Sequence, residues 1–231
     1  MNVSQTEKNW NRNPLLLRII GMGNSYFVKT PWWLKRIYPG RVWDINITEK
    51  IIYLTFDDGP HPVATPFVLD ELKKYNAKAT FFCIGKNVAE YPEIYKRILN
   101  EGHRAGNHTQ NHLNGWQTND AIYLNNIAEA TQYINSELFR PPYGRIKKSQ
   151  AKKIDTVIKN KEPKIIMWSV LSGDFDTTIS KERCLKNVVT NVKAGAIVVF
   201  HDSEKAYQHL EYTLPKALQM LLENGYRFEK L

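Results

Sequence analysis

The sequence feature that most constrains the fold is a short apolar run that ends in two adjacent carboxylates. Residues 51–56 read Ile-Ile-Tyr-Leu-Thr-Phe, and Asp57, Asp58, Gly59 and Pro60 follow directly. A continuous apolar run of this length is typical of a strand buried on both faces of a parallel sheet. Two carboxylates at its end are costly to desolvate unless a cation lies close by. We therefore expect Asp57 and Asp58 at the mouth of a strand, beside a metal or a substrate; the alternative is a solvated Asp-Gly turn.

Strand-like and helix-like segments alternate along the rest of the chain. We expect further short strands at residues 79–84, 103–107, 165–170, 196–200 and 227–231. Between them, apolar spacing predicts a helix that begins near Thr65 as its cap, and further helices over 92–100, 120–138, 148–160, 181–191 and 212–223. This alternation indicates βα units around a parallel sheet in one α/β domain. We count roughly six or seven such units, fewer than the eight of a complete TIM barrel.

The composition suits a globular enzyme-sized domain. A chain of 231 residues with 42% hydrophobic content can bury a sizeable core. No apolar run approaches the ~20 residues that a membrane-spanning helix needs. The run at residues 15–20 is interrupted by Arg18 and follows no basic region, so it does not predict a signal peptide. This indicates the cytoplasm or the cytoplasmic face of the membrane; an envelope location would require a leader that has been removed.

Charge and cysteine content weigh against two further classes of protein. The net charge of +9 is scattered, with no long basic block and no nucleic-acid motif, so we expect no nucleic acid partner. Cys83 and Cys184 match no metal or redox spacing, and we expect two buried reduced thiols. Nothing in the sequence indicates an oligomeric state.

The N-terminal segment, residues 15–43, interleaves aromatic and basic side chains. The aromatic residues are Phe27, Trp32, Trp33, Tyr38 and Trp43, and the basic ones are Lys29, Lys35, Arg36 and Arg41. Such a mixture is found where proteins contact a membrane surface peripherally. The interpretation that we favour is packing of these aromatics across the bottom or rim of the barrel. We therefore expect residues 1–45 to form an extension that packs on a main domain of residues 46–231.

Polar residues follow several of the expected strands. Asp57 with Asp58, His108 with His112, Arg140, Asp174 and His201 all occupy such positions. Because the carboxyl ends of parallel strands share one face, these side chains should converge. His108 and His112 are four residues apart, so a helical turn would place both imidazoles on one face, where they could bind one cation. The alternative is two surface histidines in a polar loop.

Five segments together resemble the NodB-homology polysaccharide deacetylases, carbohydrate esterase family four. They are TFDDGP at 55–60, HTQNH at 108–112, RPPYG at 140–144, GDF at 173–175 and VFH at 199–201. The resemblance covers about residues 50–230 and implies a distorted (β/α) barrel, with about seven parallel strands in our count. It also implies metal-dependent removal of N-acetyl groups from amino sugars.

The resemblance implies the roles of the first site residues. Asp58, His108 and His112 would hold the metal, for which we expect Zn²⁺, with Co²⁺, Ni²⁺ or Mn²⁺ as alternatives. Asp57 would be the general base that takes a proton from the water on the metal, and Arg140 would orient Asp57. A carboxylate beside a cation stays ionised and can act as a base.

The remaining implied roles concern the oxyanion and the leaving amine. The backbone N–H of Tyr143 would help to hold the oxyanion, and His201 would be the general acid that protonates the amine. Asp174 would orient His201, although Asp176 is a competitor for this role. The fourth motif departs from the family, with Leu171 where an Asp is usual.

The expected function is hydrolysis of N-acetyl groups from glycans that contain N-acetylglucosamine, of the chitooligosaccharide or peptidoglycan type. One alternative is a deacylase of a lipid-linked or nucleotide amino sugar at the inner membrane, which the aromatic N-terminal segment would favour. Another is a non-catalytic sugar-binding module. That alternative would be favoured if a metal ligand or Asp57 were missing, and none is.

Overall fold

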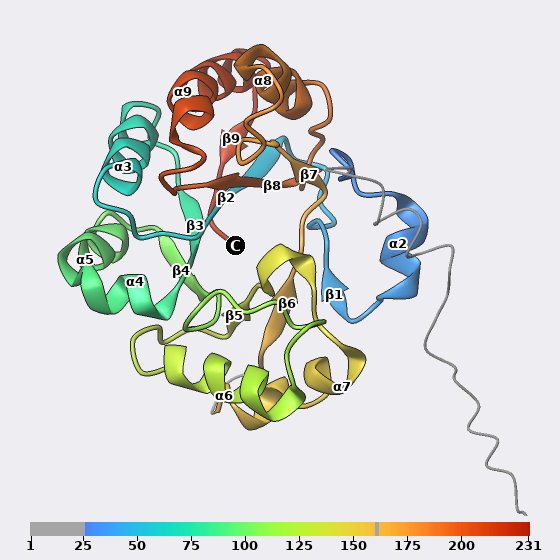
Figure 1. Ribbon diagram of the computed structural model, residues 1–231. Helices are drawn as coiled ribbons and strands as arrows, with labels where there is room; N and C mark the ends of the chain where they lie inside the picture. Colours follow the sequence, from blue (N-terminus) through green and yellow to red (C-terminus); the bar gives the residue numbers. More distant parts are fainter. Residues whose placement is uncertain (1–25, 160–161) are drawn as a thin grey trace, which may run out of the picture.

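The computed structural model describes residues 26–159 and 162–231, which form a barrel-like parallel sheet with helices outside it (Figure 1). Eight strands follow in the order β1-β6-β5-β4-β3-β2-β8-β7, and β9 pairs with the start of β2. The strands are β1 (Arg41–Val42), β2 (Ile51–Asp57), β3 (Ala79–Cys83), β4 (Arg104–Asn107), β5 (Leu138–Phe139), β6 (Lys164–Ile166), β7 (Val170–Leu171), β8 (Ile197–His201) and β9 (Arg227–Phe228). The expected α/β fold is confirmed. The strand number exceeds the expected value because β1 and β5 have only two residues each and do not stand out in the sequence, and because the strand expected over residues 165–170 is divided into β6 and β7.

The register brings the carboxyl ends of neighbouring strands to one level. Across β2 and β8, Asp57 lies opposite His201. Across β3 and β4, Cys83 lies opposite Asn107, and His108 follows Asn107 directly. The polar residues that end β2, β4 and β8 therefore meet at one rim of the barrel, where parallel α/β folds place their chemistry.

Helices cover the outside of the sheet and enclose the main core. They are α2 (Trp32–Ile37), α3 (Ala64–Lys74), α4 (Gly85–Glu90), α5 (Pro92–Asn100), α6 (Asp120–Ala130), α7 (Lys148–Ala151), α8 (Lys181–Val189) and α9 (Tyr207–Glu223), with 3₁₀ turns at Pro142–Gly144 and Ile154–Thr156. Between the sheet and its outer helices, Phe56 stacks against Phe81 and Phe200 with ring centroids 5.1 and 5.9 Å apart. Cys83 and Cys184 are buried free thiols in this part of the chain, and burial raises the pKa of Cys184 to about 12.

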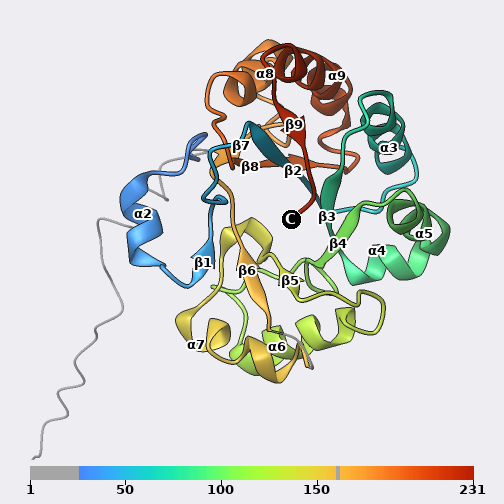
Figure 2. The ribbon, with the colours of Figure 1, turned by 180° about the vertical axis from the view of Figure 1, so that it is seen from behind.

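The barrel interior is filled by a small apolar cluster. Phe82, Leu138, Ile166 and Ile197 form this cluster, and Leu231 packs against it. Figures 1 and 2 show the chain end near the centre of the ring of strands. Since β9 pairs with the start of β2, this end fills the barrel on the side opposite the site residues.

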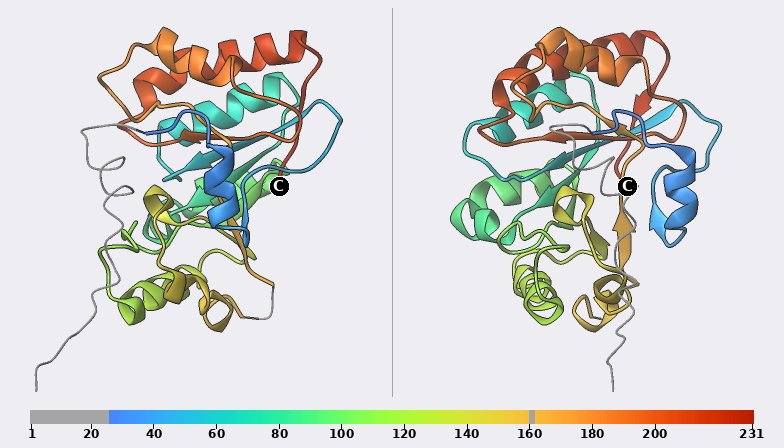
Figure 3. Two further views of the ribbon diagram at one scale, coloured as in Figure 1. Left: turned by 90° about the vertical axis from the view of Figure 1, so that its right-hand side faces the viewer. Right: turned by 45° about the vertical axis from the view of Figure 1, so that its right-hand side comes forward.

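The described part of the N-terminal segment closes the barrel wall between β6 and β7. The N–H of Leu171 donates to the carbonyl of Val28 at 2.8 Å, and the N–H of Thr30 donates to that of Ser169 at 3.0 Å. β1 adds a parallel pair with β6, and α2 lies along the outside of β1 (Figure 3). These backbone bonds make residues 28–42 part of the barrel wall.

Side chains of this segment divide between the interior and the surface. Trp43 is only 6% exposed and belongs to a core cluster, whereas Trp32 is 68% exposed. Residues 15–25 of the expected aromatic segment lie outside the described residues. Among residues 26–159 and 162–231, no helix is both long and apolar enough to cross a bilayer. The division of the chain at residue 45 stays a prediction.

Two expected helices are shorter than the sequence pattern indicates. The helix expected over 120–138 ends at Ala130, where the Thr131 hydroxyl donates to the carbonyl of Ala128 at 2.6 Å and competes with the helical bonds. The helix expected over 148–160 consists of the short α7 and a 3₁₀ turn. Conversely, the sequence does not predict α4 or the first turn of α9, because neither begins with a side-chain cap.

The strand expected over residues 165–170 is split into β6 and β7. After β6, the N–H of Met167 donates to the carbonyl of Val42 in β1 at 2.7 Å. Two residues later, the N–H of Ser169 donates to the carbonyl of Ile197 in β8 at 3.0 Å. Between these two residues the chain thus changes its bonding partner from β1 to β8. The periodicity of the sequence does not reveal such a change.

The predicted cap of the first helix after β2 is also wrong. α3 begins at Ala64, and His61 Nδ1 accepts the N–H groups of Val63 and Ala64 at 3.2 and 3.1 Å. Thr65 lies inside the helix and is fully buried, where its hydroxyl donates to Asp202. His61 therefore does the capping that we expected of Thr65.

Candidate active site

Three side chains converge at the carboxyl ends of β2 and β4. Asp58 follows β2, and His108 and His112 lie in the loop after β4. One potential ligand atom from each lies within 4.8 Å of the others. Asp58 Oδ1 is 3.6 Å from His108 Nε2 and 3.1 Å from His112 Nε2. The structure therefore brings together the three residues that the sequence places at the metal.

Residues 108–112 form a loop and not the helical turn that we considered as one possibility for the spacing of the two histidines. Thr109 and His112 instead adopt left-handed backbone angles, with φ of 67° and 55°. The Asn126 side chain, in α6, accepts two successive backbone N–H groups of this loop at 3.1 and 3.0 Å. Asn107 accepts the N–H of Thr109 at 2.8 Å. A loop held by two asparagines thus brings the histidine rings together, with centroids 5.1 Å apart.

His108 is held in the form that binds a metal. Its Nδ1 lies 2.7 Å from the carbonyl oxygen of Arg140, which can only accept, so Nδ1 carries the hydrogen. Burial lowers the pKa of His108 to about 4, despite the nearby carboxylates. The ring is therefore neutral near pH 7 and leaves Nε2 as a lone-pair donor. Metal-binding histidines generally have this arrangement.

The donor set fits a divalent cation. Asp58 Oδ1 is buried and accepts no hydrogen bond of favourable geometry, even though both imidazoles are close. Ligand atoms ~2.1 Å from a tetrahedral zinc ion lie ~3.4 Å apart, similar to the two separations here. Burial would raise the pKa of Asp58, but its contact with His112 and the imidazoles around it hold the pKa far below its usual range. An ionised oxygen and two imidazoles are ligands that zinc accepts.

Asp57 is fixed by a fully buried arginine. Arg140 Nη1 donates to Asp57 Oδ1 and to the hydroxyl of Thr55, both at 2.7 Å. Its Nε and Nη2 donate to the carbonyls of Ile166 and Met167 at 3.2 and 2.9 Å. Since these acceptors come from β2 and from the end of β6, the guanidinium is held from two sides. Asp57 therefore has one oxygen committed to Arg140 and the other directed towards the histidines, 4.0 Å from His108 Nε2.

His201 is held by Asp174 rather than by Asp176. Asp174 Oδ1 lies 2.8 Å from His201 Nδ1, and Oδ2 accepts the backbone N–H of His201 at 2.7 Å. Asp176 instead accepts hydrogen bonds from the Tyr26 hydroxyl at 3.1 Å and from Thr178. The alternative that the sequence left open is thus resolved in favour of contact with Asp174.

The electrostatics favour a protonated His201. Burial alone would lower the pKa of His201. The charge and hydrogen bond of Asp174, with the charges of Asp58 and Asp57, outweigh burial and raise the pKa to about 9. At neutral pH the imidazole is therefore cationic and can donate a proton.

A cleft of about 550 Å³ contains these groups and opens to solvent. Tyr143 has a left-handed backbone with φ of 59°, and its ring contacts that of His112 with centroids 4.6 Å apart. On the other side, Phe175 contacts the His201 ring at 5.2 Å. Tyr143 is 61% exposed, so its ring forms part of the entrance.

Comparison with known proteins identifies the family. The polysaccharide deacetylase family profile matches residues 44–157. A peptidoglycan-N-acetylglucosamine deacetylase of Bacillus cereus is 38% identical over 195 residues, which are 80% of this chain and 88% of that protein. The chain belongs to the polysaccharide deacetylases. It is therefore an enzyme of glycan N-deacetylation, as the resemblance implied.

Other relatives of this deacetylase agree. The crystal structure of the Bc1960 peptidoglycan N-acetylglucosamine deacetylase superposes with a TM-score of 0.78 and 33% identity, covering 87% of this chain and 95% of that one. A chitooligosaccharide deacetylase of Azorhizobium caulinodans is 32% identical over 71% of this chain and 79% of that protein. The two relatives have different substrate names, so the choice of glycan is a separate question.

Sequence reasoning missed several residues that hold the deacetylase site in place. Asn87 donates to the carbonyl of Asp58 at 2.7 Å and so fixes that ligand from α4. Asp202 accepts the N–H of Gly59 at 3.1 Å, and a β-carbon at Gly59 would come within 2.1 Å of the Asp202 carboxylate. Burial raises the pKa of Asp202 to about 8. Asp202 could have been found in the sequence from its position directly after His201, whereas nothing in the sequence indicated a role for Asn87.

Proposed function

We propose that this deacetylase hydrolyses N-acetyl groups of N-acetylglucosamine units in glycans of the peptidoglycan or chitooligosaccharide type, with a divalent metal. The observation that carries the proposal is that a carboxylate able to accept a proton and an imidazole able to donate one lie in the same cleft. Asp57 is a carboxylate fixed by a buried arginine, and His201 is an imidazole kept protonated by a buried carboxylate. The names of the relatives support the substrate class.

Asp58, His108 and His112 would hold the metal, which we propose is zinc. When bound, such an ion polarises the amide carbonyl and lowers the pKa of water from 15.7 towards ~7. The neutral state of His108 and the ionised state of Asp58 suit these ligand roles. The same donors also accept cobalt, nickel or manganese.

Asp57 is the group placed to take the proton of the attacking water. Its Oδ1 is bound to Arg140, so Oδ2 is the oxygen left to accept that proton. Arg140 stabilises the carboxylate and prevents rotation of the side chain, because its guanidinium is bound at four acceptors. As water adds to the carbonyl carbon, a proton passes to Asp57, and the carbonyl oxygen gains negative charge. We propose that the backbone N–H of Tyr143 donates to this oxygen; one such donor contributes ~3 kcal/mol.

His201 supplies the proton that the leaving amine needs. When the carbon–nitrogen bond breaks, the nitrogen departs as a free amine only if it is protonated in the same step. Asp174 holds the Nδ1 side of the ring, so Nε2 is the nitrogen available to the substrate. The products are acetate and the free amino sugar.

One structural feature supports the second candidate, a deacylase of a lipid-linked amino sugar at a membrane. Trp32 and Ile37 of α2 are exposed beside Arg36, the mixture expected for peripheral contact with an anionic bilayer. A nucleotide amino sugar and a non-catalytic sugar-binding module have no comparable feature in their favour. The predicted location, in the cytoplasm or on its face of the membrane, stays a prediction.

The experiment that tests the proposal is product analysis with two substrate sets. Zinc-loaded protein is incubated with N-acetylated chitooligosaccharides and with peptidoglycan fragments, and mass spectrometry follows the loss of acetyl groups. We expect free amines on glucosamine units in at least one set. Intact substrates in both sets, with metal bound, would contradict glycan deacetylation and shift weight to the lipid-linked substrate.

A further inference from the structure

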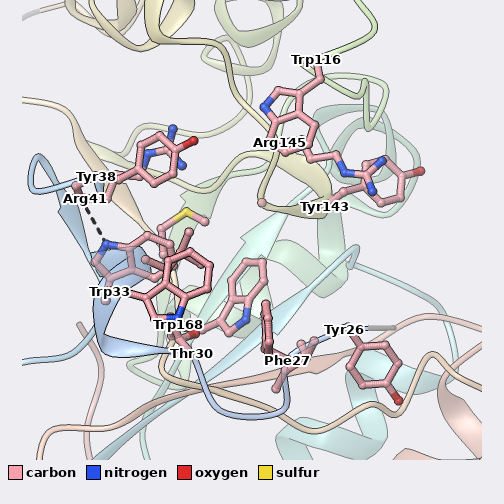
Figure 4. Close-up of a pocket in the computed structure, with 15 residues that line it drawn as sticks. Tyr26, Phe27, Thr30, Trp33, Tyr38, Arg41, Trp116, Tyr143, Arg145 and Trp168 are labelled. Atoms are coloured by element: carbon pink, nitrogen blue, oxygen red, sulfur yellow. Dashed lines mark hydrogen bonds between the residues drawn. The ribbon is translucent and has the colours of Figure 1, made fainter. Parts of the chain in front are cut away.

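A second cavity, of about 200 Å³, opens beside the catalytic cleft, and we call it the aromatic pocket (Figure 4). Its walls include the rings of Trp33, Tyr38, Trp116 and Trp168. Trp33 and Tyr38 come from the N-terminal segment before the family match, whereas the other two come from loops of the barrel. The pocket is therefore built where this segment closes against the barrel rim.

The aromatic pocket continues into the catalytic cleft. Tyr26, Tyr143, Arg145, Trp168 and Leu171 line both cavities. Figure 4 shows Tyr143 and Arg145 at one end of the pocket, across from Trp33 and Trp168. A substrate that places its acetamido group beside the metal ligands can thus extend a neighbouring group into the pocket.

The pocket carries positive charge that no acidic side chain among the described residues neutralises. Its lining contains Arg41 and Arg145 and no acidic residue, and neither arginine forms an ion pair among the described residues. Arg41 stacks on the Tyr38 ring at 4.1 Å and has only a 3.4 Å bond to the carbonyl of Ile146. Arg145 lies over the Trp116 ring at 5.4 Å. Burial lowers the pKa of Arg41, as expected for a partly buried guanidinium without a carboxylate.

We infer that the aromatic pocket binds a sugar ring that carries a carboxylate, next to the N-acetylglucosamine unit in the cleft. This inference rests on the proposed function and narrows its substrate to glycans with an acidic neighbour, such as the N-acetylmuramic acid of peptidoglycan. Neutral chitooligosaccharides have no such group. An aromatic wall with a few placed polar groups is the usual composition of a ligand site.

Two physical effects would favour such a ring. The apolar face of a sugar can pack on indole and phenol rings, which offer large rigid surfaces. A carboxylate can accept paired N–H groups from a guanidinium, and bonds of this kind are about twice as strong as neutral ones. An anion would also neutralise a guanidinium charge that no carboxylate among the described residues compensates.

The test compares two probes that differ at one carboxyl group, which is charged in one and esterified in the other. They are the disaccharide of N-acetylglucosamine β-1,4-linked to N-acetylmuramic acid, and the methyl ester of its lactyl carboxylate. Binding is measured by calorimetry with the zinc-loaded full chain carrying Asp57→Asn, so that turnover does not consume the probes. We expect the free acid to bind about tenfold more tightly than the ester.

Variants of two arginines test whether the preference for the free acid arises in the aromatic pocket. Arg145→Gln and Arg41→Gln, each added to Asp57→Asn, should reduce the preference for the acid to within about twofold. The Arg145 side chain donates no hydrogen bond to the described residues, and its backbone bond to Pro142 does not depend on the side chain, so Arg145→Gln should fold even if Arg41→Gln does not. Arg183→Gln removes the same charge from the exposed surface of α8 and should keep the preference.

Three outcomes would overturn the inference. They are equal binding of acid and ester, an undiminished preference in Arg145→Gln, and displacement of the acid by decyl β-glucoside, which would assign the pocket to an acyl chain. Acetate release by the wild-type protein is measured separately on both probes. Release from both at equal efficiency would overturn this inference and leave the proposed function standing. A preference in binding without any release would support carboxylate recognition and contradict deacetylation.

Discussion

Asp174 holds His201 through both of its carboxylate oxygens, one at the ring Nδ1 and the other at the backbone N–H, at 2.8 and 2.7 Å. Asp174 is fully buried and takes a further hydrogen bond from Ser172 at 2.9 Å. The carboxylate therefore fixes both the orientation of the imidazole and its protonation. The imidazole that we propose as proton donor is in this way fixed at the end of β8, opposite Asp57, the proposed base, at the end of β2.

The pH dependence of turnover should reveal this pair. Asp174 contributes to raising the pKa of His201 to about 9, and the proposed role of His201 as the acid requires the protonated imidazole. Activity should therefore decline as pH rises through the pKa of His201. Asp174→Asn removes the charge, so the alkaline decline should move to lower pH and turnover should fall about a hundredfold. The check is the profile of kcat against pH for both proteins; coincident alkaline limbs would exclude His201 as the donor.

Zinc content should depend on His112. We expect His112→Ala to lose most bound zinc after dialysis, because only Asp58 and His108 remain of the three proposed ligands. His61→Asn is the matched control, since it removes a histidine that caps α3 outside the cluster. Atomic absorption measures the metal per chain. Equal zinc in the two variants would remove His112 from the metal site.

The buried Arg140–Asp57 pair should matter for stability as well as turnover. Arg140→Met leaves Asp57 and two backbone carbonyls without their donor, and breaking a buried pair costs about 3–5 kcal/mol. Urea unfolding should show a lower midpoint and a free energy of unfolding that is smaller by this amount, and acetate release should be lost. Arg183→Met, on the exposed face of α8, is the control and should unfold like the wild type. An unchanged midpoint for Arg140→Met would mean that the guanidinium has no structural role.

Deletion of residues 1–45 should destabilise the protein. The deletion removes β1, the bonds of Val28 and Thr30 to the barrel, and the buried Trp43. We expect loss of the cooperative thermal transition seen by circular dichroism. Trp32→Ala tests the membrane interpretation separately, because it removes exposed surface only. A folded, active deletion variant that no longer sediments with anionic vesicles would favour membrane contact over packing.

Much of the site could be predicted because its residues follow apolar runs that mark strand ends. Asp57, His108, Arg140 and His201 follow or end β2, β4, β5 and β8, and parallel topology then brings them together. The spacing of His108 and His112 left open whether the two residues lie on a helical turn or in a loop. Four residues separate two histidines equally well in a helix and in a loop with left-handed residues, and only the tertiary contacts decide between them.

The supporting residues could not be predicted in the same way. Asn126 lies in α6 and Asn87 in α4, and each bonds to a loop that is distant in sequence. Buried polar residues on a helix give no sign of the partner that satisfies them. The aromatic pocket likewise depends on how Trp33 of the N-terminal segment meets Trp168 across the barrel rim, which no local pattern encodes.

The most direct test of the account is a parallel measurement of zinc content and acetate release for the wild type and Asp57→Asn. Oligosaccharides that contain N-acetylglucosamine, acidic and neutral, serve as substrates. We expect the wild type to release acetate, and Asp57→Asn to bind the same amount of zinc but to release acetate at least a hundredfold more slowly. Acetate release by Asp57→Asn at the wild-type rate, with zinc bound, would contradict this expectation.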